Sequence, residues 1–232
     1  MRFLLFNKPY QVLCQFTDSQ HAESAHNNNE TLRQNLSDFI DMPGYYAAGR
    51  LDYLSEGLLI LTNDGAFQHR ITDPANKMQK SYWVQVEGTP SVQSIKELAN
   101  GVTLRDGKTL PAKLELIDAP KIWQRSPAVT PHRDANSQWI NMSIHEGKNR
   151  QIRRMLAHVG HPVLRLVRHQ IGPWSIENLT PGQHSLSSVN LPKSQATAPS
   201  KRSTAATKPR VKQWQKQKTK PTNTSKRSKL KP

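Results

Sequence analysis

The sequence has a single cysteine and no long hydrophobic run. Cys14 alone excludes an intramolecular disulfide and a cysteine-based zinc site, and it is typical of a protein from a reducing compartment. The apolar run after Arg2 covers only residues 3–6, which is too short for a secretory signal, and no run is long enough to span a membrane. We therefore expect a cytoplasmic protein with no membrane partner, in which Cys14 is a small buried residue.

Acidic residues are absent beyond residue 190. Residues 191–232 carry 13 Lys and Arg, whereas residues 1–190 carry 20 basic and 17 acidic residues, so the net charge of +16 divides into +13 and +3. This basic segment has little apolar surface to bury. We expect a folded domain over residues 1–187 and a disordered basic tail over residues 188–232. The tail is either a solubilising extension or a polycation that holds RNA through counterion release, and we favour the second.

The apolar patterns predict more strands than helices. Hairpin-like spacing, rather than strict alternation of strands and helices, favours an α+β fold with a largely antiparallel sheet. A hairpin turn is expected at residues 106–107 and a long surface loop over residues 121–137. Strands are expected over residues 3–6, 58–61, 82–86, 113–117, 140–144, 163–167 and 183–186, and helices over about 31–40, 90–100 and 149–159.

The most informative stretch is residues 49–65, which read GRLDYLSEGLLILTNDG. Asp52 lies two residues from Arg50 and shortly before an apolar block that suits a buried strand, after which Asp64 is available to cap a helix. An aspartate near a fixed cation stays ionised and therefore nucleophilic. From spacing alone, a turn residue or a structural partner of Arg50 is the favoured interpretation of Asp52, and the catalytic role is only a candidate.

Three further segments occur in order around this stretch: FLLFNKP from residue 3, KSYWVQVEG from residue 80 and EGKNRQIRRML from residue 146. Together, the four segments resemble the pseudouridine synthases, in the branch that modifies bacterial ribosomal RNA, over about residues 1–187. The resemblance implies the pseudouridine synthase fold. This fold has a central mixed, mostly antiparallel sheet with flanking helices, and two subdomains around an RNA-binding cleft.

The resemblance also implies which residues form the site. Asp52 is the expected catalytic residue, Tyr82 is expected to stack on uracil near the carbon that loses a proton, and Arg153 is expected to pair with Asp52. By residue type alone, Tyr82 could be packing and the arginines a solvated helix face. Trp83 is expected on the opposite face, in the core. Leu51 and Ile152 are the expected pocket walls, and the expected RNA contacts are Arg50, Lys80, Lys148, Arg150 and Arg154.

The expected reaction converts a uridine of 23S rRNA, free or in a large-subunit assembly intermediate, to pseudouridine after base flipping. It needs no cofactor, and we expect no metal site, because Gly160 separates His158 from His161 and no third ligand accompanies them. Whether Asp52 attacks the sugar or removes a sugar proton stays open.

The Asn-Lys-Pro motif begins within seven residues of Met1, so no S4-type RNA-binding module is expected before it, and a single-domain monomer is favoured. Two alternatives are a noncatalytic RNA-binding or ribosome-assembly protein and the same chemistry on 16S rRNA or tRNA. An intact set of Asp52, Tyr82 and Arg153 argues against the first.

Overall fold

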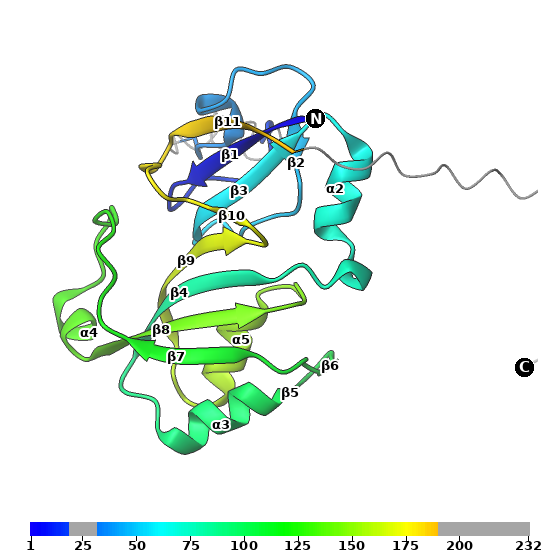
Figure 1. Ribbon diagram of the computed structural model, residues 1–232. Coiled ribbons are helices and arrows are strands. Elements are labelled where there is room, and N and C mark those ends of the chain that lie inside the picture. Colours follow the sequence, from blue (N-terminus) through cyan, green and yellow to red (C-terminus); the bar gives the residue numbers. More distant parts are fainter. Residues whose placement is uncertain (19–31, 190–232) are drawn as a thin grey trace, which may run out of the picture. The chain divides into compact units, whose positions relative to one another are not determined.

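The computed structural model describes residues 1–18 and 32–189 (Figure 1). Its main sheet has the strand order β11-β1-β3-β9-β4-β8-β7, with β2 paired to β3 and β10 paired to β9. The pair β3–β9 is parallel, and the other pairs in the described residues are antiparallel. The expected mixed, mostly antiparallel α+β fold is therefore confirmed. The predicted basic tail lies outside the described residues, apart from its first two.

The strands of the main sheet are β1 (Arg2–Lys8), β2 (Tyr46–Ala47), β3 (Glu56–Thr62), β4 (Lys80–Glu87), β7 (Lys113–Ile117), β8 (Ser137–Ile144), β9 (Val163–Ile171), β10 (Trp174–Ser175) and β11 (His184–Ser188). A separate hairpin consists of β5 (Thr103–Leu104) and β6 (Gly107–Lys108). The helices are η1 (Leu36–Asp38), α2 (Gly65–Thr72), η2 (Pro74–Asn76), α3 (Val92–Asn100), α4 (Pro131–Ala135) and α5 (Gln151–His158). None of these helices has the length and apolar character needed to cross a bilayer.

Strand β3 is buried on both faces, which explains its uninterrupted apolar sequence. Leu58 and Ile60 pack into one hydrophobic cluster, whereas Leu59 and Leu61 pack into another on the opposite face. Asp64 then caps α2, because its side chain accepts a hydrogen bond from the amide of Phe67. The predicted buried strand and the predicted cap are both confirmed.

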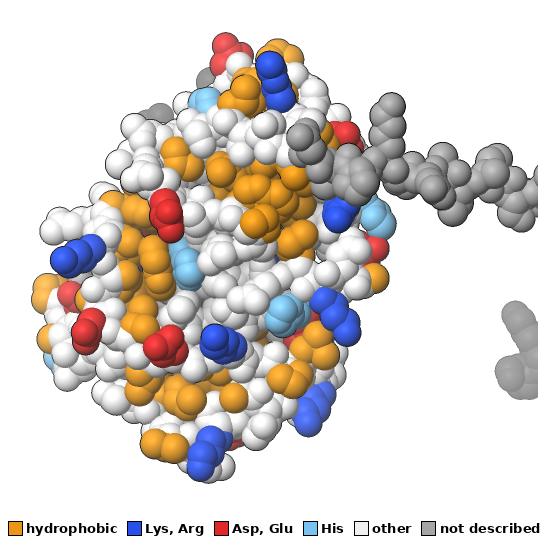
Figure 2. Space-filling model, in the orientation of Figure 1, with side chains coloured by type: hydrophobic (Ala, Val, Ile, Leu, Met, Phe, Trp, Pro, Cys, Tyr) orange, Lys and Arg blue, Asp and Glu red, His pale blue; other side chains and the backbone are white. Residues whose placement is uncertain are grey.

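A third cluster covers one face of β4 and β8. The apolar stripe of α5, which includes Ile152, Met155 and Leu156, packs here as its spacing predicts, together with Leu98 of α3. In the view of Figure 2, hydrophobic side chains instead gather over β1, β10 and β11. The described chain thus has two packed halves that share the central strand β9 (Figure 1).

The two halves join through a short parallel contact between β3 and β9. Glu56 pairs with Val167 and Gly57 pairs with Arg168. Gly57 has a φ of +102°, and a Cβ atom added there would lie 2.3 Å from the carbonyl oxygen of Arg168. Only glycine permits this approach.

The helix predicted over residues 31–40 is wrong. The described part of this segment holds only the single turn η1. Asn35 starts that turn, because its side chain accepts from the amide of Ser37 while the Asp38 carboxylate accepts from the amide of Asn35. A capping box marks where a helix begins, so its position in the middle of residues 31–40 is incompatible with one helix over that segment.

Other boundaries also differ from the predictions. Helix α3 begins after Ser91, whose hydroxyl caps it, rather than at Pro90. The predicted loop over residues 121–137 contains the short helix α4, and strand β9 continues four residues beyond residue 167. The hairpin turn lies one residue earlier than expected, at residues 105–106. Cys14 is only partly buried.

Candidate active site

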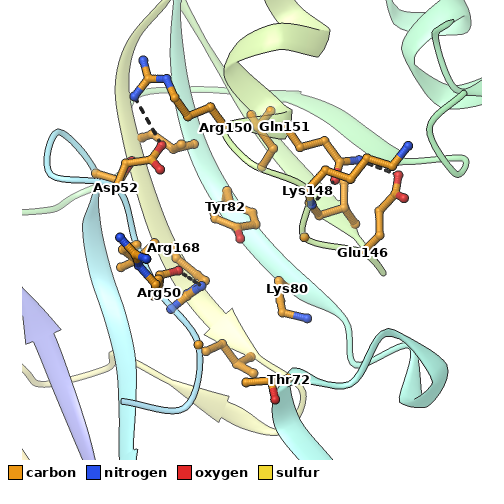
Figure 3. Close-up of a pocket in the computed structure, with 18 of the residues that line it drawn as sticks. Arg50, Asp52, Thr72, Lys80, Tyr82, Glu146, Lys148, Arg150, Gln151 and Arg168 are labelled. Carbon is orange, nitrogen blue, oxygen red and sulfur yellow. Dashed lines mark hydrogen bonds and ion pairs between the residues drawn. The ribbon is translucent and has the colours of Figure 1, made fainter. Parts of the chain in front are cut away.

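A pocket of about 400 Å³ lies where the two halves of the sheet meet (Figure 3). The loop before β3 contributes Asp52, β4 contributes Tyr82, α5 contributes Ile152 and β9 contributes Arg168. Four chain segments that are distant in sequence therefore surround one cavity. Its wall combines apolar side chains with a carboxylate and several cations, as in sites that bind and transform an organic ligand.

Asp52 is held in a short, well-anchored loop. Its carbonyl accepts a hydrogen bond from the amide of Ser55 at 3.0 Å, and the amide of the preceding Leu51 donates to the sulfur of Cys14 at 3.3 Å. The Asp52 side chain is half-buried, with 28% of its surface exposed. Its carboxylate is consequently fixed in direction yet open to a ligand.

Two guanidinium groups flank the Asp52 carboxylate. Nη1 of Arg150 lies 3.6 Å and Nε of Arg153 lies 3.9 Å from the same oxygen. Arg150 lines the pocket, and Figure 3 shows it facing Asp52. Arg153 does not line the pocket: it lies behind Asp52, and its Nη2 donates to the carbonyl of Leu54 at 2.7 Å. The structure thus brings both arginines to Asp52, one from the cavity and one from the protein interior.

Burial sets the electrostatics of this group. Desolvation and repulsion from Arg150 lower the pKa of Arg153, while the negative charge of Asp52 opposes that shift. Nε of Arg153 is buried without a hydrogen-bond partner among the described residues. Arg153 is thus a buried cation beside the Asp52 carboxylate.

Tyr82 points into the pocket from β4 and is buried there. Trp83 lies on the opposite face, as predicted, where it is partly buried and stacks on His169 with ring centroids 4.4 Å apart. Lys80 shares the face of Tyr82 and donates to the carbonyl of Met78. Burial lowers the pKa of Lys80, and the charge of Arg168 lowers it further. The pocket floor, formed by Lys80, Tyr82 and Arg168, therefore carries two basic side chains.

The remaining expected RNA contacts differ in placement. Lys148 lines the pocket, but its amine donates to the carbonyl of Lys108 in the β5–β6 hairpin. Arg154 does not line the pocket and forms a two-pronged ion pair with Asp106 of the same hairpin, at 2.6 and 3.0 Å. Arg50 is exposed on the pocket lining. Leu51 and Ile152 lie on the pocket wall.

Sequence reasoning missed Arg168. Its Nε donates to the carbonyl of Leu58 at 2.8 Å, and its Nη1 reaches the carbonyl of Arg50 at 3.4 Å. The predicted strand ended at residue 167, so this side chain lay outside every expected element. A basic residue continuing an apolar strand was the available signal, because such a charge is rarely buried without a function.

Known proteins resemble this chain in sequence and in fold. A family model described as RNA pseudouridylate synthase matches residues 2–158, a range that includes all four sequence segments. The ribosomal large subunit pseudouridine synthase E of Vibrio parahaemolyticus is 48% identical over 182 residues, which cover 78% of this chain and 72% of that protein. The protein of the same name from Xanthomonas axonopodis pv. citri is 48% identical over 179 residues, covering 77% and 90%. A solved crystal structure of a pseudouridylate synthase superposes with a TM-score of 0.64 at 28% identity, covering 81% of this chain and 70% of that one.

Proposed function

The chain belongs to the RNA pseudouridylate synthase family, and on that premise we propose that it converts one uridine of 23S rRNA to pseudouridine. The observation that carries the proposal is the placement of Asp52 and Tyr82 on one pocket, with two guanidinium groups within 4 Å of the carboxylate. The large subunit is proposed because relatives at 48% identity bear the name ribosomal large subunit pseudouridine synthase E.

The target nucleotide must leave the RNA stack to reach Asp52. Extruding a base costs a few kcal/mol, which contacts inside the pocket have to offset. A cavity of about 400 Å³ suits one nucleotide. Tyr82 offers its ring for stacking, Leu51 and Ile152 exclude water from the reacting atoms, and Arg50 fills the space left in the RNA.

Asp52 starts the reaction in its ionised form. It either attacks C1′ of the ribose or removes a sugar proton, and the bond from C1′ to N1 of uracil breaks. The base then turns so that C5 joins C1′, with Tyr82 participating in the loss of the C5 proton. Arg153 orients the carboxylate from behind, and Arg150 faces it from the pocket. The product has the composition of the substrate, so no cofactor is consumed.

RNA affinity is proposed to come from the cations around the pocket and from the basic tail. Arg50, Lys80, Lys148, Arg150 and Arg154 are the proposed RNA contacts, and the 13 basic residues after residue 190 add attraction that does not depend on RNA sequence. We propose that the chain acts as a monomer in the cytoplasm, where ribosomal RNA is matured.

The experiment is to map pseudouridines in the RNA of cells that lack this protein and to restore either the native chain or Asp52→Asn. We expect one 23S site to disappear, to return with the native chain and to stay absent with Asp52→Asn. Asp41→Asn is a matched control, because Asp41 is exposed and lies outside the pocket.

The outcomes separate the alternatives. If every pseudouridine persists without the protein, the noncatalytic alternative is favoured and the proposal fails. If the lost site belongs to 16S rRNA or tRNA, the substrate assignment is wrong. Restoration by Asp52→Asn would refute the role of the carboxylate.

A further inference from the structure

Arg168 is a buried cation without an acidic partner. Only 4% of the residue is exposed, and no carboxylate of residues 1–18 or 32–189 lies within 4 Å of its guanidinium. Two backbone carbonyls accept hydrogen bonds from its Nε and Nη1, and its Nη2 is buried without a partner among these residues. Burying an unpaired charge is costly unless something compensates it.

Arg165 on the same strand shows how this fold satisfies a buried arginine. Its Nε and Nη2 donate to the two oxygens of Glu56 at 2.8 and 2.9 Å, and Nη2 also donates to the carbonyl of Trp123. Arg165 does not line the pocket, whereas Arg168 does. The arginine that faces the cavity is therefore the one left without a counter-charge.

The place of Arg168 suits a base rather than a phosphate. Tyr82 is its direct neighbour on β4, so the ring proposed to stack on uracil and the guanidinium share the pocket floor (Figure 3). The cations suited to phosphates are the exposed ones, such as Arg50, because phosphates of an RNA strand stay in water. One of the two carbonyls that accept hydrogen bonds from Arg168 belongs to Arg50, which lies two residues before Asp52 in the sequence.

The proposed reaction creates a negative charge at this floor. When the C1′–N1 bond breaks, its electron pair goes to uracil, whose charge spreads over N1 and the carbonyl oxygens O2 and O4. In one route a carboxylate oxygen of Asp52 bonds to C1′, and in the other Asp52 takes a sugar proton; both leave the same uracil anion. When C5 bonds to C1′, the bond from Asp52 to C1′ breaks in the first route, and in the second Asp52 returns the sugar proton to the ribose. The C5 proton is then lost and N1 gains a proton, so atoms and charge balance.

We propose that the Arg168 guanidinium, buried at the pocket floor beside Tyr82, stabilises by its positive charge the uracil anion that forms as the glycosidic bond breaks. This inference rests on the proposed pseudouridine synthase function. A fixed cation that meets charge formed in the transition state acts mainly on kcat, because it gains little from the neutral ground state. Arg168 exchanges no proton in the reaction.

The test compares Arg168→Gln with Arg168→Lys in single-turnover assays. The substrate is a transcript of the rRNA segment that loses its pseudouridine in the deletion strain, labelled with tritium at C5 so that proton loss is counted. Both variants lose hydrogen bonds to the carbonyls, but only Gln loses the charge. We expect Gln to lower the maximal rate about 100-fold with a Kd for RNA within about 3-fold of native, and Lys to keep at least a tenth of the native rate.

Two additions sharpen the comparison. Millimolar guanidinium chloride is expected to restore part of the rate of Arg168→Gln, because the free ion can supply the missing charge. Arg133→Gln is the control, since Arg133 is exposed, pairs with Glu87 and lies outside the pocket; it is expected to match the native chain. If Arg168→Gln does not fold, Arg168→Met is measured in its place. If neither variant folds, the maximal rate of Arg168→Lys is the test: at least a tenth of the native rate supports the inference, and a smaller rate overturns it.

Each result supports or overturns the inference. Equal losses in Gln and Lys would show that Arg168 only positions the Arg50–Asp52 loop. If Arg168→Gln only weakens RNA binding, and the slope of log K for binding against log salt concentration is smaller by about one, Arg168 contacts a phosphate instead. A native rate for Arg168→Gln would also overturn it. Failure of the native chain to release tritium from any rRNA segment would instead refute the proposed function, so the two failures are distinguishable.

Discussion

The close approach of β3 to β9 at Gly57 predicts a large loss of stability for Gly57→Ala. An added Cβ atom would lie 2.3 Å from the carbonyl oxygen and 2.8 Å from the amide nitrogen of Arg168. Both are backbone atoms, so no side chain can rotate away to relieve the contact. The φ of +102° at Gly57 adds strain for any residue with a Cβ. Relief requires β3 to separate from β9.

Gly107→Ala is a matched control, because Gly107 has nearly the same φ, +101°, and nothing within 4 Å of an added Cβ. Gly107→Ala introduces the backbone strain alone. Its net effect is a loss of about 1 kcal/mol in the free energy of unfolding, because the lower entropy of the unfolded chain offsets part of the strain. At Gly57, separating the strands also weakens the two-residue contact with β9. With about 1 kcal/mol for each hydrogen bond and more for loosened packing, we expect a total loss of about 4 kcal/mol.

Urea unfolding followed by tryptophan fluorescence measures both losses in the full chain. We expect the unfolding midpoint to fall much further for Gly57→Ala than for Gly107→Ala at an unchanged slope. Turnover should also fall for Gly57→Ala alone, because the pocket lies at the same junction. Equal losses of stability in the two variants would refute the reasoning, since backbone strain is all that they share.

Three further measurements test other features. Burial lowers the pKa of Lys8 to about 8 from an ordinary 10.5, so the unfolded chain retains a proton between these values that the folded chain has released. Over that pH window the free energy of unfolding of the native chain is therefore expected to rise by up to about 3 kcal/mol more than that of Lys8→Met. Parallel plots of unfolding free energy against pH for the two chains would contradict this. Glu56→Gln leaves the buried Arg165 unpaired and is expected to lower the free energy of unfolding in urea by about 3 kcal/mol. Glu87→Gln, which removes an exposed pair, is expected to lower it by less than about 1 kcal/mol. Similar losses in the two variants would count against a stabilising role for the buried pair. A chain ending at residue 191 is expected to modify the same uridine with weaker RNA binding, most visibly at low salt, whereas lost turnover under saturating RNA would contradict a tethering role for the tail.

Features set by neighbouring residues could be predicted from the sequence. The apolar run of β3 indicated a buried strand, and the 3.6-residue spacing of Ile152, Met155 and Leu156 placed the buried face of α5. The predicted bounds of helices were wrong where a hydrogen bond from a polar side chain set the first residue of the helix. Asn35 starts a single turn where a longer helix was predicted, and Ser91 takes the capping position expected one residue before Pro90.

Motif order likewise identified the family and singled out Asp52, because four segments in sequence carry that information without any knowledge of distance. It could not assign partners to the cations. Arg150 and Arg154 are four residues apart, yet one faces Asp52 while the other pairs with Asp106. Arg150 is held by a left-handed backbone conformation at the start of α5, with a φ of +46°, which depends on how the loop docks.

The sequence by itself determined the fold class, the family and the carboxylate expected to react. The tertiary structure alone decided which cations surround that carboxylate, since Arg153 meets Asp52 only after α5 packs on β4 and β8. It also decided that Arg168 lies at the pocket without a carboxylate partner. The physical reason is that charges act over a few ångströms in space, and residues about a hundred positions apart reach that distance only through the packing of the whole sheet.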